Sequence, residues 1–219
     1  MTTRSRLLTA FLVTPLLAAV LGCSAPALQL SLWNPIQLHA ENTDVRGARI
    51  NLFYANNRNV SGLDLGLGLN RCKNATGVQI AAGANAAIDL AGFGDGNCKG
   101  VQLAGLANVC TKNLTGVQLA AVNYADLNVR GVQAGLVCGS GYLHGLQLGA
   151  VNSSDLDMYG VQAGAFNSCG TNQLVQFGLV NRARTLGGVQ IGLINISRDQ
   201  TIPFLPLINV GGWLKKAEP

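Results

Sequence analysis

The chain has 219 residues, which is room for one domain of ordinary size after any leader is removed. Charged residues make up only 11% of the chain and aromatic residues 5%, while glycine occurs 28 times and mean hydropathy is positive. The net charge of +5 is scattered, and pairs such as Lys215-Lys216 are too small to follow a phosphate backbone. We therefore expect no nucleic-acid partner.

Residues 1–22 have the composition of a signal peptide. Arg4 and Arg6 give a positive start, and a mostly apolar run follows from residue 7 to residue 22. This run is shorter than a membrane-spanning helix, which needs about 20 apolar residues, and no longer apolar stretch follows. The segment predicts export.

The segment Val20-Leu21-Gly22-Cys23-Ser24 resembles a bacterial lipobox, in which the cysteine is acylated and becomes the new N-terminus. It predicts lipidation of Cys23 and a location at the outer membrane or cell surface. The alternative is ordinary signal-peptide cleavage after Ala25 or Ala27, which would discard Cys23 with the leader.

Internal repeats dominate the rest of the chain and share the template G-[VL]-Q-x-[GA]-x-x-N. They are spaced 14–16 residues apart, with one insertion of about eight residues around Ala86 to Gly96. The first two repeats are degenerate, as expected beside a cap. The glutamine position of the ten repeats is held by Arg49, Asp64, Gln79, Gln102, Gln118, Gln133, Gln147, Gln162, Gln176 and Gln190.

Apolar and polar residues alternate within each repeat. In the last one, Val189, Ile191 and Leu193 alternate with Gln190 and Gly192. This is the period of a β-strand with one buried face, and we expect the aliphatic side chains to form that face.

A second apolar position lies two residues before the leading residue of each repeat. It has the same parity as the glutamine, so a straight strand would place it opposite the other aliphatic side chains. A bend at the leading glycine removes this conflict, because glycine tolerates the backbone angles of a corner. The position is held by Val45, Val60, Ala75, Cys98, Leu114, Val129, Leu143, Met158, Asn172 and Leu186.

Two short strands per repeat, joined by a bend, predict an all-β fold: a β-solenoid of about ten coils of 14–16 residues. One coil hides too few aliphatic side chains to fold alone, so the coils must stack. At about 4.8 Å per coil the stack would form a rod of roughly 48 Å, in which equivalent Gln and Asn side chains can form amide ladders. The alternative fold is a β-meander closed into a barrel, with each repeat as one strand.

These patterns divide the chain into four segments. Residues 1–22 are the signal peptide, 23–42 the N-terminal anchor and first strand, 43–197 the repeat solenoid, and 198–219 a C-terminal cap. The cap contains two prolines between residues 202 and 210, which cannot continue a central ladder.

The repeats, together with SLWNPIQ at residues 31–37, GLDLG at 62–66 and PLIN at 206–209, resemble bacterial surface-repeat proteins of the spirochaete type. The resemblance covers most of the chain after the leader. It implies an exported or surface location. It carries no functional residues, because the family has no established biochemical activity.

We predict no catalytic, cofactor-binding or metal-binding residues. His39 and His144 are the only histidines, and His144 has no ligand-type neighbour at metal-site spacing. No G-x-S-x-G nucleophile elbow is present. Arg49 and Asp64 share the glutamine position, and we expect them to form an ion pair between stacked coils.

Six cysteines are present, and lipidation of Cys23 would leave five, enough for at most two internal disulfides. Cys72, Cys98 and Cys110 fall in successive connectors between repeats. We predict a disulfide between Cys98 and one of its neighbours, either Cys72 or Cys110.

The expected function is that of an exported, lipid-anchored, non-enzymatic surface repeat protein that acts as a structural or adhesive scaffold. Its expected partners are the membrane, through the lipid anchor, and an unknown protein or glycan. The alternative is an outer-membrane β-barrel or a pore-like protein.

Overall fold

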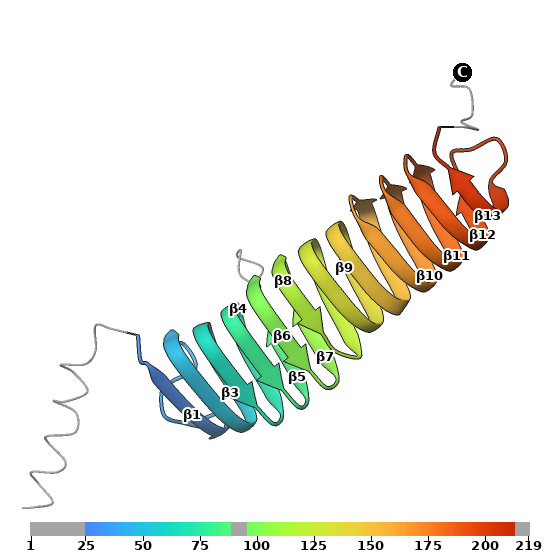
Figure 1. Ribbon diagram of the computed structural model, residues 1–219. Coiled ribbons are helices and arrows are strands. Elements are labelled where there is room, and N and C mark those ends of the chain that lie inside the picture. Colours follow the sequence, from blue (N-terminus) through green and yellow to red (C-terminus); the bar gives the residue numbers. More distant parts are fainter. Residues whose placement is uncertain (1–24, 89–95, 213–219) are drawn as a thin grey trace, which may run out of the picture.

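The computed structural model describes residues 25–88 and 96–212. The predicted signal peptide and Cys23 lie outside the described residues, as do part of the insertion and the last seven residues of the chain. Regular structure in the described residues is entirely β (Figure 1). Its strands are β1 (Leu28–Trp33), β2 (Ile36–Gln37), β3 (Val45–Gly66), β4 (Leu69–Ala81), β5 (Ala84–Ala87), β6 (Cys98–Ala104), β7 (Ala107–Cys110), β8 (Leu114–Leu119), β9 (Val122–Met158), β10 (Val161–Asn172), β11 (Val175–Leu186), β12 (Val189–Ser197) and β13 (Phe204–Val210).

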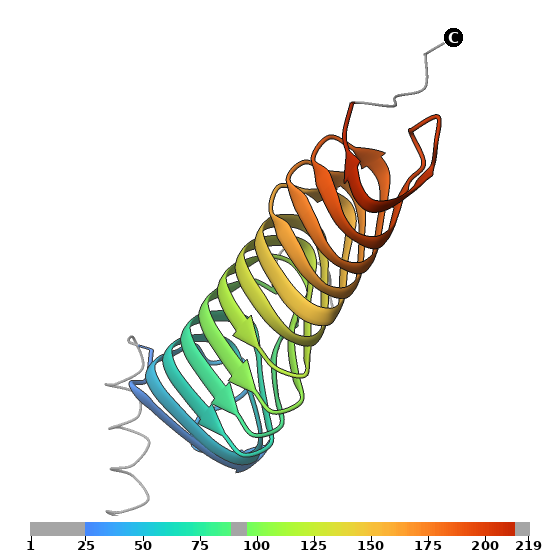
Figure 2. The ribbon, with the colours of Figure 1, turned by 45° about the vertical axis from the view of Figure 1, so that its right-hand side comes forward.

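The strands wind into a β-solenoid of about nine turns, which Figures 1 and 2 show as an elongated stack of coils. Successive coils pair in parallel, and the register places equivalent repeat positions beside each other, for example Gln102 beside Gln118 and Gln176 beside Gln190. The meander and barrel alternative is wrong, because consecutive repeats are parallel windings rather than antiparallel staves.

Antiparallel strands close both ends of the stack. Strand β2 pairs with β1 at the N-terminal end, and β13 pairs with β12 at the C-terminal end. The chain therefore covers its terminal coils with local hairpin-like pairs, which blunts the open edges of the parallel sheet.

The prediction of which side chains face inward is wrong. Gln190 is fully buried, whereas Ile191 and Leu193 point outward and are 37% and 61% exposed. Alternation separates two faces of a strand without saying which one is inside, and here the inner face carries the amides. An amide interior is stable only because each buried polar group finds a partner in the next coil.

The glutamine ladder runs along the interior through seven consecutive side-chain hydrogen bonds. Each glutamine Nε2 from Gln102 to Gln190 donates to the Oε1 of the preceding glutamine, at 2.6–2.8 Å. Several also donate to a carbonyl six residues later, as Gln147 does to Ser153 at 3.2 Å. The predicted amide ladder is therefore present, and it forms part of the core.

A second ladder of asparagines lies at the position that closes each repeat, and its donors point the opposite way. Asn152 donates to Asn167, and Asn181 to Asn195, at 2.9 and 2.8 Å. Glycines make room for it: a Cβ on Gly192 would lie 2.6 Å from the Nδ2 of Asn181. Cys138 interrupts the row and leaves the buried Oδ1 of Asn152 without a hydrogen-bond partner.

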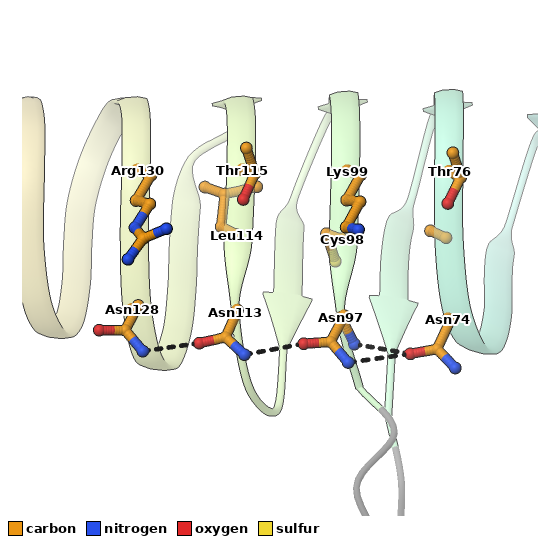
Figure 3. Close-up of a pocket in the computed structure, with 11 residues that line it drawn as sticks. Asn74, Thr76, Asn97, Cys98, Lys99, Asn113, Leu114, Thr115, Asn128 and Arg130 are labelled. Carbon is orange, nitrogen blue, oxygen red and sulfur yellow. Dashed lines mark hydrogen bonds between the residues drawn. The ribbon is translucent and has the colours of Figure 1, made fainter.

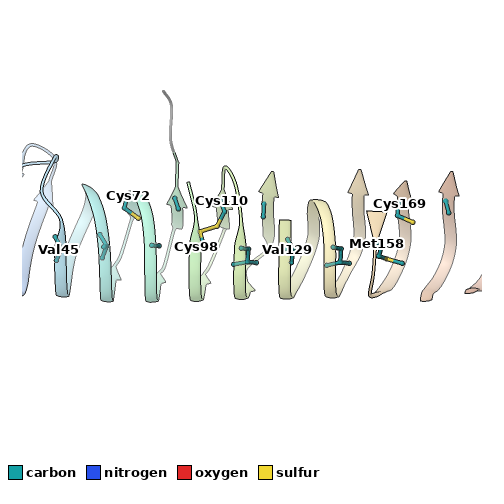
Figure 4. Close-up of a cluster of buried hydrophobic side chains, with 14 residues drawn as sticks. Val45, Cys72, Cys98, Cys110, Val129, Met158 and Cys169 are labelled. Atoms are coloured by element: carbon teal, nitrogen blue, oxygen red, sulfur yellow. A yellow bond between two sulfur atoms is a disulfide. The ribbon is translucent and has the colours of Figure 1, made fainter. Parts of the chain in front are cut away.

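The remaining interior is a column of aliphatic side chains beside a column of small ones (Figure 4). Nine of the ten predicted second apolar positions are buried apolar or cysteine side chains, and the tenth, Asn172, is buried too. The small column alternates mainly among Ala, Cys and Ser, which limits the width of each coil.

Most leading glycines have positive φ, as expected for the predicted corner. The corner does not bring the two sets of aliphatic side chains to the same side of the strand. Gly131 has φ of +141°, and a Cβ there would lie 1.9 Å from the carbonyl oxygen of Gly116. A glycine is required because the coils approach each other closely at this point.

A buried ion pair terminates the glutamine ladder at its N-terminal end. Arg49 donates twice to Asp64, at 2.7 and 2.6 Å, and Gln79 donates to the same carboxylate at 2.7 Å. The predicted pairing is confirmed, with both side chains fully buried. Burial opposes the guanidinium charge, but the Asp64 carboxylate prevails and raises the pKa of Arg49.

We expect Asp64→Asn to destabilise the protein by about 3–5 kcal/mol, because it leaves the Arg49 charge buried without its counter-ion. The double variant Arg49→Gln/Asp64→Gln extends the amide ladder by two neutral rungs and should lose less stability. Chemical denaturation followed by circular dichroism measures both.

The exposed pair of Arg58 and Asp44 supplies the control, since Asp44→Asn should change stability by at most about 1 kcal/mol. A double variant that is as unstable as Asp64→Asn would show that the charges themselves are needed at the end of the ladder.

Candidate binding surfaces

A polar groove of about 650 Å³ crosses several coils on the outside of the rod (Figure 3). It forms where an outward side chain lies on each side of the buried aliphatic column. We call it the asparagine groove, lined by Asn74, Ala75, Thr76, Asn97, Cys98, Lys99, Asn113, Leu114, Thr115, Asn128 and Arg130.

The first wall is a row of stacked asparagine amides joined from coil to coil. Asn128 donates to Asn113 at 2.7 Å, and Asn113 donates to Asn97 at 2.9 Å. The row continues through Asn74 and Asn59 and ends on the carboxylate of Asp44. These bonds hold the amides at fixed spacing along the rod.

Asp44 gives this row a charged end, as Asp64 does for the inner ladder. Its two carboxylate oxygens accept from Arg58 at 2.7 and 2.8 Å, and Asn59 donates to it at 2.8 Å. The hydrogen bond from Arg58 is the main cause of the lowered pKa of Asp44. A fixed negative charge therefore accepts the last donor of the row.

The second wall is an exposed row of hydroxyl and cationic side chains: Thr76, Lys99, Thr115 and Arg130. Buried Ala75, Cys98 and Leu114 form the floor between the walls. The groove thus combines amides, hydroxyls and two cations at the spacing of the coils, about 4.8 Å. Such a surface suits an extended, hydroxyl-rich ligand that carries acidic groups.

Two exposed rings continue the second wall beyond Arg130. His144 occupies the equivalent place in the next coil and stacks on Tyr159, with ring centroids 5.1 Å apart and planes 6° from parallel. His144 lies within β9 and is exposed. The first wall changes over the same coils, because Tyr142 and Asp157 replace the asparagines.

The structure joins Cys98 to Cys110, one of the two predicted pairings, with Cα atoms 6.3 Å apart. The prediction assumed a bond between connectors of neighbouring coils, and the structure shows a different arrangement. The bond crosses the interior of a single coil, from the aliphatic column to the small column, and does not link connectors of stacked coils (Figure 4).

Cys72, Cys138 and Cys169 are free and buried. Burial raises the pKa of Cys72 and of Cys169 to about 12, and that of Cys138 to about 11. Thiols in this state are poor nucleophiles at neutral pH and behave as small apolar side chains.

Within residues 25–88 and 96–212, no three His, Cys, Asp or Glu side chains gather closely enough to hold a metal ion. The same residues contain no helix long and apolar enough to span a membrane.

Sequence reasoning missed both rows of the asparagine groove, although a signal was available. An asparagine directly precedes the buried aliphatic position in five consecutive coils, at residues 59, 74, 97, 113 and 128. This regular offset from a core column indicates one continuous surface row.

The sequence matches no family model and no curated protein, and the structure matches no solved structure.

Proposed function

We propose that this protein is an exported, lipid-anchored, non-enzymatic surface repeat protein whose solenoid is a binding scaffold for a glycan. The observation that carries the proposal is the asparagine groove, a row of hydrogen-bonded amides facing a row of Thr, Lys and Arg side chains.

The chemistry of the groove favours an acidic polysaccharide. Amides and hydroxyls exchange hydrogen bonds with sugar hydroxyls, and Lys99 and Arg130 pair with carboxylate or phosphate groups. The stacked rings of His144 and Tyr159 add two exposed aromatic side chains at one end of the row. Because the groups repeat with the coils, a polymer can make the same contact several times.

The anchor and the surface location are supported by sequence features, namely the apolar leader and the lipobox around Cys23. The resemblance to spirochaete-type surface-repeat proteins supports the same location.

We expect the fragment that begins at Ala25 to bind acidic glycans on a glycan array and in isothermal titration calorimetry. Lys99→Gln/Arg130→Gln should weaken that binding about tenfold or more, since two charge-assisted hydrogen bonds are lost. Raising the salt concentration should weaken wild-type binding and have less effect on the variant.

The control is Arg182→Gln, which removes one exposed cation of the C-terminal half of the rod and is compared with the single variants Lys99→Gln and Arg130→Gln. Equal binding by wild type and by the groove variant, or binding lost equally in the control, would reject the groove as the glycan site.

The anchor is tested separately by metabolic labelling with palmitate in a bacterial host. The wild-type chain should incorporate the label, and Cys23→Ala should not, because the variant lacks the thiol that is acylated. Ser24→Ala is the control and should be labelled normally. Labelling of Cys23→Ala, or absence of label from wild type, would exclude a lipoprotein anchor at this position.

A further inference from the structure

One side of the rod, which we call the apolar face, carries large aliphatic and aromatic side chains along its whole length. These are the outward side chains flanking the buried glutamine column. Its most exposed members include Leu67, Leu106, Leu136, Leu179 and Leu193, which are 54–67% exposed. The C-terminal cap continues the face, since Ile208 of β13 pairs beside Ile191 and is 58% exposed.

No outward side chain of the apolar face is charged. Its only charged residues are Arg49 and Asp64, which point inward and neutralise each other. The segments concerned are 28–33, 48–54, 63–69, 78–84, 101–107, 117–122, 132–137, 146–151, 161–166, 175–180 and 189–194. Apart from that pair, every charged residue within residues 25–88 and 96–212 therefore lies on the other part of its coil or in the connections between coils.

The size of the face exceeds what soluble monomers leave exposed. About nine turns at about 4.8 Å, each with about six residues at about 3.3 Å, give a footprint of roughly 800 Å². The largest apolar patch of a typical monomer is about 300–600 Å². A continuous face of this area indicates an apolar partner.

We propose that the apolar face lies on a lipid bilayer, with the rod parallel to the membrane surface and the asparagine groove turned toward water. The proposal rests on the proposed lipid anchor for the choice of partner. Cys23 precedes Leu28 by five residues, a reach of at most about 17 Å. Leu28 and Leu30 are exposed members of the same face, so the acyl chains and the face would enter the same bilayer.

The backbone of the face can tolerate contact with hydrocarbon. Most of its residues pair in register with the coils on both sides, as residues 175–178 and 180 of β11 do with β10 and β12. The backbone N–H and C=O groups of these residues are satisfied within the sheet, which is the condition for backbone to contact lipid without a large penalty. The arrangement is the β-sheet counterpart of an amphipathic interfacial helix.

The relief of the face favours lipid over a second copy of the chain. Along one row, Leu136 is followed by Ala150 and Ala165 in the next two coils, and then by Leu179 and Leu193. A second, rigid copy of the chain would need a complementary surface shape to pack against such an uneven surface. Acyl chains fill uneven relief without that requirement.

Flotation of the fragment from Ala25 with vesicles of phosphatidylethanolamine and phosphatidylglycerol tests the proposal. The fragment contains every described coil and both caps but lacks the anchor, so only the folded rod can bind. Wild type should float with the vesicles. Leu136→Glu/Leu179→Glu/Leu193→Glu should reduce its partitioning at least tenfold.

The control is Leu127→Glu/Leu156→Glu, which adds two such charges at leucines that are 40% and 43% exposed on the charged part of the coil. It should float like wild type. Thermal melting identifies any variant that fails to fold, and the three single substitutions on the face then replace the triple variant, each with a smaller loss.

Failure of wild type to float, or equal flotation of a folded face variant, would overturn the proposal. Sedimentation of wild type without lipid as a stable dimer that the face substitutions dissociate would assign the face to a second copy instead. Neither result bears on palmitate labelling or glycan binding, so the proposed function is judged separately.

Discussion

The buried glutamine ladder is the interaction on which the rest of the structure depends. Each side chain donates to its predecessor over seven consecutive bonds, and the row ends on the Arg49–Asp64 pair. Burial of these amides would be strongly unfavourable if a single rung lacked its neighbour. The ladder therefore couples every coil to the next and fixes the register, because a slipped strand would leave amides without partners.

An amide interior also determines the surface. The glutamines occupy the inner face of each strand, so the aliphatic residues that alternate with them must point outward. This produces a charge-free apolar face on one side and leaves the charged and groove-forming residues on the other. Both proposed interactions, with a glycan and with a bilayer, follow from this division.

The repeat pattern was sufficient to predict the solenoid, the amide ladders and an unusual backbone at the leading glycine. It could not predict which face is inside. Ile191 was expected inside and Gln190 outside, and the structure shows the opposite. A period of two is the same for either orientation of the strand. The second apolar position contained the answer, since its parity agrees with that of glutamine. The Cys98–Cys110 bond was one of two predicted pairings, but it was predicted as a link between connectors of stacked coils. Spacing along the chain does not show which residues meet across one coil.

Hydrogen exchange of side-chain amides, followed by NMR after transfer to deuterated solvent, tests the buried ladder most directly. The Nε2 protons of Gln118, Gln133 and Gln147 should exchange only when the coils open. They should therefore remain protected far longer than those of exposed Gln173. Exchange of the ladder protons as fast as those of Gln173 would contradict the amide interior and the outward orientation of the aliphatic residues that follows from it.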